Sequence, residues 1–301
     1  IVWQIGTGYF GCRDEHGNFC PDAFQERAVL DQIKMIEIKL SQGAKPSHGG
    51  VLPAAKVTEE IAKIRLVETG GDVISPPGHS TFDSPRGLLD FVAELRTLSN
   101  GKPVGFKLCI GRKYEFLAIC KAMLDTGIYP DFITIDGAEG GTGTAPVEYS
   151  NRFGLPCLEA VSFVHNCLRG VGLRDHIRLV ASGKTASGFD VVTKLAMRAD
   201  IVNAARTMMM ALGCVQAQAC NTNECPTGIA TQNPARGRAL DIEAKHKRVA
   251  SFQQRTLASA FDIMGAMGLD DPAALRAHLI WRRSADETYQ QFIALMPPRS
   301  V

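Results

Sequence analysis

The chain has 301 residues and a formal net charge of +2, and 45% of its residues are hydrophobic. It is long enough for one large α/β core or two smaller ones, and its nearly balanced charge without a basic stripe argues against a nucleic-acid partner. Its 9 cysteines lack a regular framework and indicate a reducing compartment, while no apolar run reaches the roughly 18 residues of a membrane-spanning helix.

The first residues, Ile-Val-Trp-Gln, already read as a strand and include no initiator Met. We therefore expect further sequence before Ile1. The protein is expected to be cytoplasmic, and a membrane anchor or targeting signal in that upstream sequence is left open.

Short apolar runs alternate with helical stretches, which is typical of βα units on a parallel sheet. Strands are predicted at residues 2–6, 35–40, 104–109, 132–136, 178–182 and 200–205. The periodicity predicts helices at 85–98, 114–126, 189–198, 243–267 and 272–280, the last two outside the sheet. In the first of these, one face carries Leu88, Leu89, Phe91, Val92 and Leu95. Residues 42–84 are expected to form a long loop rich in Gly and Pro, and loops of this length are usually functional or disordered.

Polar residues interrupt strands that a parallel sheet would normally bury on both faces. Because side chains alternate along a strand, Glu37 and Lys39 share one face, as do Gly105 and Lys107, and Thr134 and Asp136; Gln4 lies opposite Trp3 and Ile5. Isolated buried charges are costly, so this polar face predicts a lined cavity. Internal ion pairs, such as Glu37 with Lys39 or Lys107, are the alternative.

Two segments indicate phosphate binding. Residues 136–146 place four glycines just after a strand, where backbone N–H groups can approach a ligand closely. Gly183 and Arg206 follow the last two strands, and in eight-stranded barrels the last two strand–helix loops frequently bind phosphate. A phosphate there would accept hydrogen bonds from the Gly183 backbone and from Arg206.

Three cysteines, Cys214, Cys220 and Cys225, have Cys-x5-Cys-x4-Cys spacing, and Pro226 follows the last of them. Close-set thiolates ending in a Cys-Pro step are typical of iron–sulfur ligation, and three ligands favour a [3Fe–4S] cluster. Zinc normally takes four ligands, disulfide pairing would leave one thiol over, and three inert buried thiols are the remaining alternative.

A set of sequence segments resembles the synthase domain of glutamate synthase, in particular the short FMN-binding members of that family. The matching segments are residues 36–46 (IEIKLSQGAKP), 49–53 (GGVLP), 56–58 (KVT), 74–77 (ISPP), 107–108 (KL), 140–143 (GGTG), 145–146 (AP), 154–156 (GLP) and 223–232 (NECPTGIATQ), with Cys214 and Cys220 before the last. The resemblance covers residues 1 to about 235 and implies an FMN-binding (β/α)8 barrel with a [3Fe–4S] cluster.

The resemblance also implies a reaction, in which 2-oxoglutarate and ammonia form an imine that reduced flavin converts to L-glutamate (the EC 1.4 class), with electrons entering through the cluster. Lys107 would stabilise the anionic reduced flavin, while Lys39 would bind a substrate carboxylate and Glu37 would relay a proton. The implied cofactor-binding residues are Gln4, Lys107, Asp136, Gly140, Gly141, Thr142, Gly183 and Arg206, and the implied metal ligands are Cys214, Cys220 and Cys225.

The domain expectation is an FMN-binding barrel at residues 1–240, comprising strands 3–8 and the iron–sulfur loop at 214–232, followed by a helical extension at 241–301. We expect this chain to lack the first two strands of the eight-stranded barrel. The family's Pro-His-His-Asp is replaced by Gly78-His79-Ser80, so a substrate or ammonia contact is expected to differ. Neither a glutaminase domain nor a nicotinamide fingerprint is visible in the sequence.

The expected partners are therefore ammonia, or glutamine through a separate glutaminase, and an electron-donor protein or NAD(P)H-oxidising subunit; a homo-oligomer is also expected. Two other functions stay open, because fold alone does not determine function. One is a related FMN barrel oxidoreductase with another substrate, and the other is a non-catalytic scaffold or electron-transfer subunit that keeps the cluster without the flavin.

Overall fold

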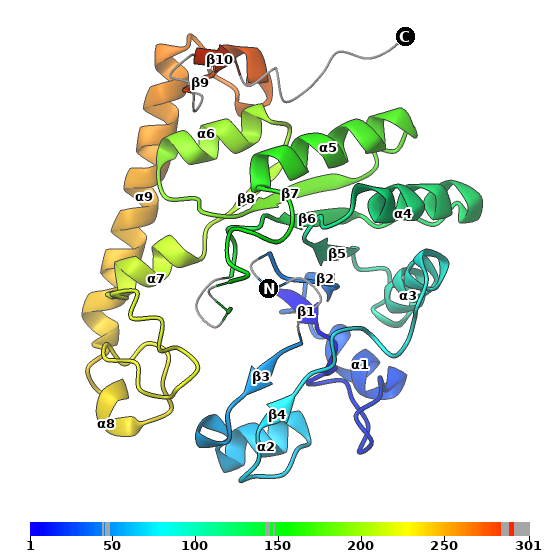
Figure 1. The fold of residues 1–301 in the computed structure, drawn as a ribbon, viewed down its shortest axis with the longest axis vertical. Helices are drawn as coiled ribbons and strands as arrows, with labels where there is room; N and C mark the ends of the chain where they lie inside the picture. The colour runs from blue at the N-terminus through cyan, green and yellow to red at the C-terminus, as the bar shows by residue number, and fades with distance from the viewer. Residues whose placement is uncertain (44, 46–48, 142–144, 147, 284–288, 292–301) are drawn as a thin grey trace.

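The computed structural model describes residues 1–43, 45, 49–141, 145–146, 148–283 and 289–291. In this part of the chain, one parallel sheet of six strands runs in the order β1 (Val2–Ile5), β2 (Met35–Lys39), β5 (Val104–Leu108), β6 (Phe132–Asp136), β7 (Arg178–Ser182) and β8 (Ile201–Asn203). The sheet curls, and helices α3 to α6 lie along its outer side (Figure 1). This is an open α/β barrel, which confirms the predicted fold class and the six predicted strands.

The sheet strands are connected by α1 (Pro21–Ala28), α3 (Pro85–Leu98), α4 (Lys113–Thr126), α5 (Cys157–Gly170) and α6 (Gly188–Ala196), and α7 (Arg206–Leu212) follows the last strand. Helix α3 begins where the Ser84 hydroxyl accepts the backbone N–H of Gly87. It buries the five apolar residues predicted for its inner face. Helix α4 ends at Gly127, whose positive φ suits a C-cap glycine.

The core lies between the outer face of the sheet and these helices. Ile36, Ile38, Phe106 and Ile133 are fully buried there, as expected for the apolar set of each alternating strand. The polar residues of the same strands therefore point to the inner side of the barrel, where the site described below is built.

The segment that was expected to be a long loop contains regular structure. A hairpin of β3 (Val51–Leu52) and β4 (Val73–Ile74) encloses the turn η1 (Ala54–Lys56) and helix α2 (Glu59–Arg65). The prediction of one long loop over residues 42–84 is thus wrong, because two-residue strands are too short to show alternation. The start of α2 did have a sequence signal, since Thr58 caps it and two acidic residues follow.

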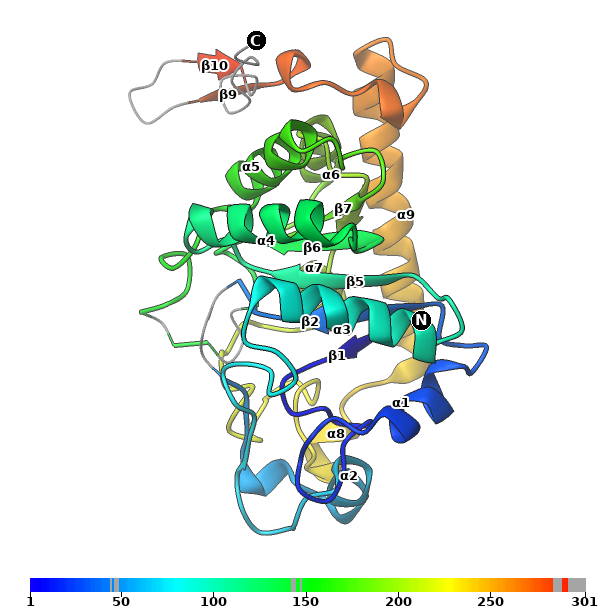
Figure 2. The same cartoon turned by 90° about the vertical axis from the view of Figure 1, so that its right-hand side faces the viewer.

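The long helix α9 (Ile242–Ala266) packs along α6 and α7 (Figure 2), and a short α8 (Pro234–Gly237) precedes it. The helix predicted at 272–280 is wrong. This segment consists of two short 3₁₀ turns, η2 (Pro272–Ala274) and η3 (Ala277–Leu279), because Leu275 between them has a non-helical ψ of 136°. Strands β9 (Trp281–Arg283) and β10 (Tyr289–Gln291) follow. Within the described residues, no helix is both long and apolar enough to span a bilayer.

Candidate active site

The inner face of the sheet carries a hydrogen-bonded polar row. Strand register aligns Gln4 with Glu37, and the Gln4 amide donates to Glu37 Oε1 at 2.5 Å. The Thr134 hydroxyl donates to Glu37 Oε2, also at 2.5 Å. Both oxygens of a nearly buried carboxyl group are therefore satisfied by neutral donors from two other strands. Glu37 uses these bonds instead of an ion pair with a lysine, so the ion-pair alternative does not describe it.

Lysine side chains gather beside this row. Lys39 on β2 lies next to Lys107 on β5 in the register, and the Lys39 ammonium donates to Gln42 Oε1 at 3.1 Å. Burial lowers the pKa of Lys39, and the positive charges of Lys107 and Lys45 lower it further, against weaker opposing effects of Asp136 and Glu37. The local field is thus positive, and an anion bound here would relieve it.

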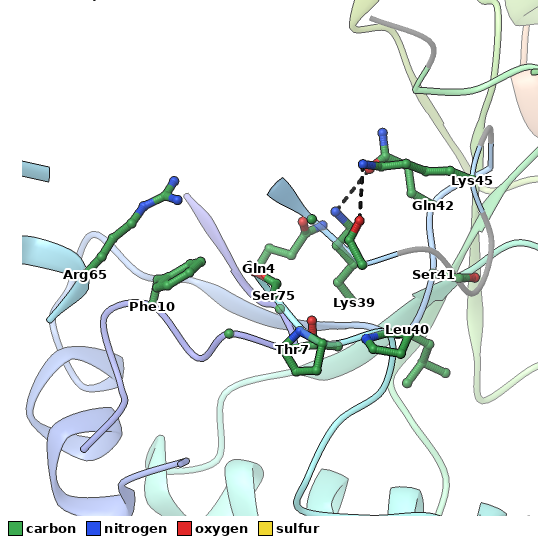
Figure 3. A pocket seen from close by; sticks show the side chains of 16 residues that line it. Gln4, Thr7, Phe10, Lys39, Leu40, Ser41, Gln42, Lys45, Arg65 and Ser75 are labelled. Atoms are coloured by element: carbon green, nitrogen blue, oxygen red, sulfur yellow. Dashed lines mark hydrogen bonds between the residues drawn. The ribbon is translucent and has the colours of Figure 1, made fainter. Parts of the chain in front are cut away.

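A cavity of about 330 Å³ opens next to Lys39, at the carboxyl ends of β1 and β2 (Figure 3). Its lining includes three cationic side chains, Lys39, Lys45 and Arg65, and none of its described lining residues is Asp or Glu. The uncharged polar lining comes from Gln4, Thr7, Ser41, Gln42 and Ser75. A concave site with several cations and no acid is suited to a polyanionic small molecule.

Two of these cations, Lys45 and Arg65, were absent from the predicted site residues. Lys45 lies in the segment of residues 36–46 that carries the family resemblance, which was the available signal for it. Arg65 gave none, because it is the last residue of a short helix in an apparent loop. In the structure its guanidinium lies 4.4 Å from the centroid of the Phe10 ring, and burial lowers its pKa.

The glycine-rich segment after β6 packs against the end of β2. Asp136 Oδ2 accepts the backbone N–H of Gly43 at 2.9 Å, and a Cβ on Gly43 would lie 1.7 Å from the Gly137 carbonyl oxygen. A Cβ on Gly140 would lie 2.3 Å from Asp136 Oδ1, and the Gln42 amide donates to the Gly141 carbonyl at 3.3 Å. These predicted residues are therefore brought together at one edge of the site. Thr142 lies outside the described residues.

The predicted phosphate ligands converge on a different point. Arg206 Nη2 donates to the backbone carbonyl of Glu139 at 3.1 Å, and a Cβ on Gly183 would lie 3.2 Å from Glu139 Oε1. The Glu139 carboxylate accepts the Cys157 backbone N–H at the start of α5, at 3.1 Å. Gly183 and Arg206 thus both lie next to Glu139, Arg206 at its backbone carbonyl and Gly183 beside its carboxylate.

The three predicted metal ligands lie in one loop without converging. Cys214 Sγ accepts the Gln216 backbone N–H at 3.4 Å, and Cys225 Sγ lies 3.4 Å from the Thr227 hydroxyl. Among the described residues, no group of three or more His, Cys, Asp or Glu side chains is arranged to hold a metal ion. As described, the thiols do not fit a cluster, and the [3Fe–4S] assignment stays a prediction.

Cys225 nevertheless has the environment of a stabilised thiolate. Burial acts to raise its pKa, but hydrogen bonds from the Thr227 side chain and from the backbone of Ala230, Thr227 and Ile229 outweigh burial and lower the pKa to about 7.

The cysteine loop is fastened to the turn η1, which precedes the helix that carries Arg65. The Lys56 ammonium on η1 donates to the Cys220 and Ala230 carbonyls, and the Asn223 amide donates to the Ala55 carbonyl at 3.0 Å. Sequence reasoning missed this role of Lys56, although the residue lies in a matched segment.

Known proteins share the sequence pattern and the fold of this chain. Residues 1–270 match the model of a family described as the conserved region in glutamate synthase. The chain is 39% identical over 301 residues to the glutamate synthase large subunit-like protein YerD of Bacillus subtilis (strain 168), covering 98% of this chain and 57% of the relative. It is 35% identical over 279 residues to an archaeal glutamate synthase (NADPH) of Methanocaldococcus jannaschii, covering 92% and 51%. The chain therefore spans about half the length of these relatives.

The solved structures similar to this chain include a doubly substituted flavocytochrome b2 with sulfite bound. The TM-score is 0.53 at 13% identity, and the match covers 92% of this chain and 53% of that one. At this identity the likeness supports the fold alone.

Proposed function

Since the chain belongs to the glutamate synthase family, we propose that it provides the synthase centre of an oxidoreductase. In this proposal, FMN-dependent reductive amination converts 2-oxoglutarate and ammonia to L-glutamate. The single observation that carries the substrate assignment is the cavity with Lys39, Lys45 and Arg65 in its lining and no acidic residue among its described lining.

The charges of the cavity match a dicarboxylate. A ligand with one carboxylate leaves a surplus of two positive charges in a half-buried site, whereas a dicarboxylate leaves one. A buried charge is stabilised only when it is paired, and bidentate contact with a guanidinium suits a carboxylate. Burial lowers the pKa of Lys39, and the charges of Lys107 and Lys45 lower it further, so a carboxylate bound beside Lys39 would act against that lowering.

The inner face of the sheet supports the FMN assignment. Gly6, just after β1, has open space where a Cβ would be, and Lys107 presents its charge beside Lys39 in the register. These residues fit a planar, partly anionic group. When FMN is bound, the chemistry that it supplies is hydride transfer to the imine carbon. Lys107 would hold negative charge, and the region of Gly183 and Arg206 would hold the phosphate after displacing the Glu139 carboxylate.

Within this proposal, Glu37 is the group that donates or accepts the proton. Its two oxygens accept hydrogen bonds from Gln4 and Thr134, so its orientation is fixed while it stays on the cavity side of the sheet. A positioned carboxyl group can donate or accept a proton without reorganising.

The finer assignments are separate proposals. A [3Fe–4S] cluster at Cys214, Cys220 and Cys225 rests on their spacing and on the lowered pKa of Cys225; no step above depends on it, and iron and sulfide analysis of the full-length protein tests it. An external electron donor, an external ammonia source and homo-oligomerisation belong to the same group of proposals.

The test is 2-oxoglutarate binding by the full-length holoprotein, measured by isothermal titration calorimetry. Arg65→Gln should weaken binding by about tenfold or more, the loss expected when a charge-assisted contact of about 1.5–3 kcal/mol is removed. The matched control is Lys63→Gln, which removes an exposed positive charge from the same helix but outside the cavity lining. Equal effects of the two variants, or no binding by the unsubstituted protein, would refute the assignment.

A further inference from the structure

The cavity wall contains an aromatic ring, Phe10, with two arginine guanidinium groups near it: Arg13 lies 5.7 Å from the ring centroid, and Arg65 lies closer. Of these two arginines, Arg65 is the one that lines the cavity. Phe10 lines the cavity together with Arg65, and the Arg65 guanidinium lies 4.4 Å from the centroid of its ring. We propose that Phe10 is a positioning residue that holds Arg65 in the orientation needed to bind one end of a dicarboxylate. The proposal rests on the function proposed above and identifies what gives the cavity its selectivity for two carboxylates.

Arg65 needs such support because its own surroundings offer little. It is the last helical residue of α2, and Leu66 after it is left-handed. None of the ion pairs within the described residues includes Arg65. A long arginine side chain without a carboxylate partner keeps much of its rotamer entropy. A ring face at 4.4 Å supplies a cation–π contact that reduces this freedom before a ligand arrives.

Phe10 is itself held rigidly. The preceding Tyr9 is 1% exposed, and its hydroxyl lies within 3.0–3.3 Å of donors or acceptors on His79, Ser80 and Thr81. On its other side, the Phe10 ring packs against the small apolar cluster that includes Ala62 of α2. The ring is therefore a fixed platform between the loop after β1 and the helix that carries Arg65.

Gly8 provides the space for this platform. A Cβ on Gly8 would lie 2.8 Å from Phe10 Cζ and 2.9 Å from Phe10 Cε2. A contact below 3 Å cannot be kept, so an added Cβ must push the ring away from its packed position. Gly8→Ala should displace the ring without removing any charged or polar group, so it tests the geometry independently of a change at Phe10.

The position of Arg65 relative to the lysines sets the ligand length that the cavity accepts. Figure 3 shows Arg65 and Phe10 on one side of the cavity and Lys39, Gln42 and Lys45 on the other. A ligand with a carboxylate at each end contacts both sides, whereas a monocarboxylate of similar size contacts one. A fixed guanidinium therefore discriminates between them, and a mobile one discriminates less.

The experiment compares 2-oxoglutarate with 2-oxobutyrate, which has one carboxylate, using the full-length holoprotein. Dissociation constants are measured by calorimetry, and kcat is measured with 2-oxoglutarate. For Phe10→Leu and Gly8→Ala, we expect the Kd of 2-oxoglutarate to rise about 2- to 30-fold, the range of a cation–π contact. The Kd of 2-oxobutyrate and kcat should be unchanged, and Phe10→Tyr, which keeps the ring, should restore tight binding.

The outcomes separate this inference from the proposed function. Equal weakening of both acids by Phe10→Leu, or no weakening of either by Phe10→Leu and Gly8→Ala, overturns the positioning role. If Arg65→Gln weakens 2-oxoglutarate binding while both of those variants do not, the cavity assignment stands and the inference alone fails. If Arg65→Gln has no effect, the cavity assignment fails. Should Phe10→Leu not fold, Gly8→Ala decides.

Discussion

The hydrogen bond between Thr134 and Glu37 allows a quantitative test of how the polar face is held. Replacing Thr134 by Val keeps the shape of the side chain and removes the hydroxyl that donates to Glu37 Oε2 at 2.5 Å. Both partners are buried, with Thr134 2% and Glu37 8% exposed, so water cannot replace the lost donor without rearrangement. The carboxyl oxygen is left unsatisfied.

The expected loss follows from that burial. A hydrogen bond to a charged group contributes about 1.5–3 kcal/mol, and an unsatisfied buried acceptor costs the full desolvation penalty of the group. Gln4 still donates to the other oxygen, which limits the damage to one bond. We therefore expect Thr134→Val to lower the free energy of unfolding by about 2 kcal/mol. Urea unfolding followed by circular dichroism measures this change from the midpoint at constant slope.

The chain contains a matched control. Thr193 on α6 is also buried, at 3% exposed, but its hydroxyl has no hydrogen-bond partner among the described residues. Thr193→Val makes the same chemical change without breaking a bond and should be neutral or stabilising. An equal loss of unfolding free energy in both variants would refute the reasoning. The loss would then come from replacing a buried hydroxyl by a methyl group and not from breaking the bond to Glu37.

Three other predictions follow from neighbouring contacts. Lys56→Met removes the bonds to Cys220 and Ala230 and should raise hydrogen exchange in residues 214–232 at least about tenfold, with Lys63→Met as the unaffected control. Gly43→Ala forces a Cβ to within 1.7 Å of a carbonyl oxygen and should lower stability by about 1–3 kcal/mol; an unchanged urea midpoint would contradict this. Burial, with the positive charges of Arg174 and Arg198, lowers the pKa of His165 from 6.5 to about 4. As the pH falls, the unfolded chain therefore binds this proton at a higher pH than the folded chain does. Stability should fall by up to about 3 kcal/mol as pH drops from 6.5 to 4, and His165→Gln should flatten that dependence in urea unfolding.

The sequence was most informative where a single element contains the whole pattern. The alternation of Glu37 and Lys39 with isoleucines along one strand predicts the face that each side chain occupies, and the register of the sheet confirms it. The same holds for α3, whose inner face is readable from its 3.6-residue period. These patterns depend only on local geometry, which the backbone enforces.

The sequence was least informative where function arises from segments far apart in the chain. The contact between Phe10 and Arg65 joins a loop after β1 to the end of a seven-residue helix. Nothing in either segment's periodicity points to the other, because each is short and irregular. The same limit explains the missed pairing of Lys56 with the cysteine loop. Long-range pairs of this kind depend on tertiary packing, which a pattern of one chain segment does not encode.

These two missed contacts lie on the same segment. Lys56 and Ala55 fasten η1 to the cysteine loop, and α2, which begins three residues after Lys56, ends at Arg65 in the cavity lining. The cysteine loop is therefore tied by hydrogen bonds to the segment whose helix ends at Arg65 in the cavity lining.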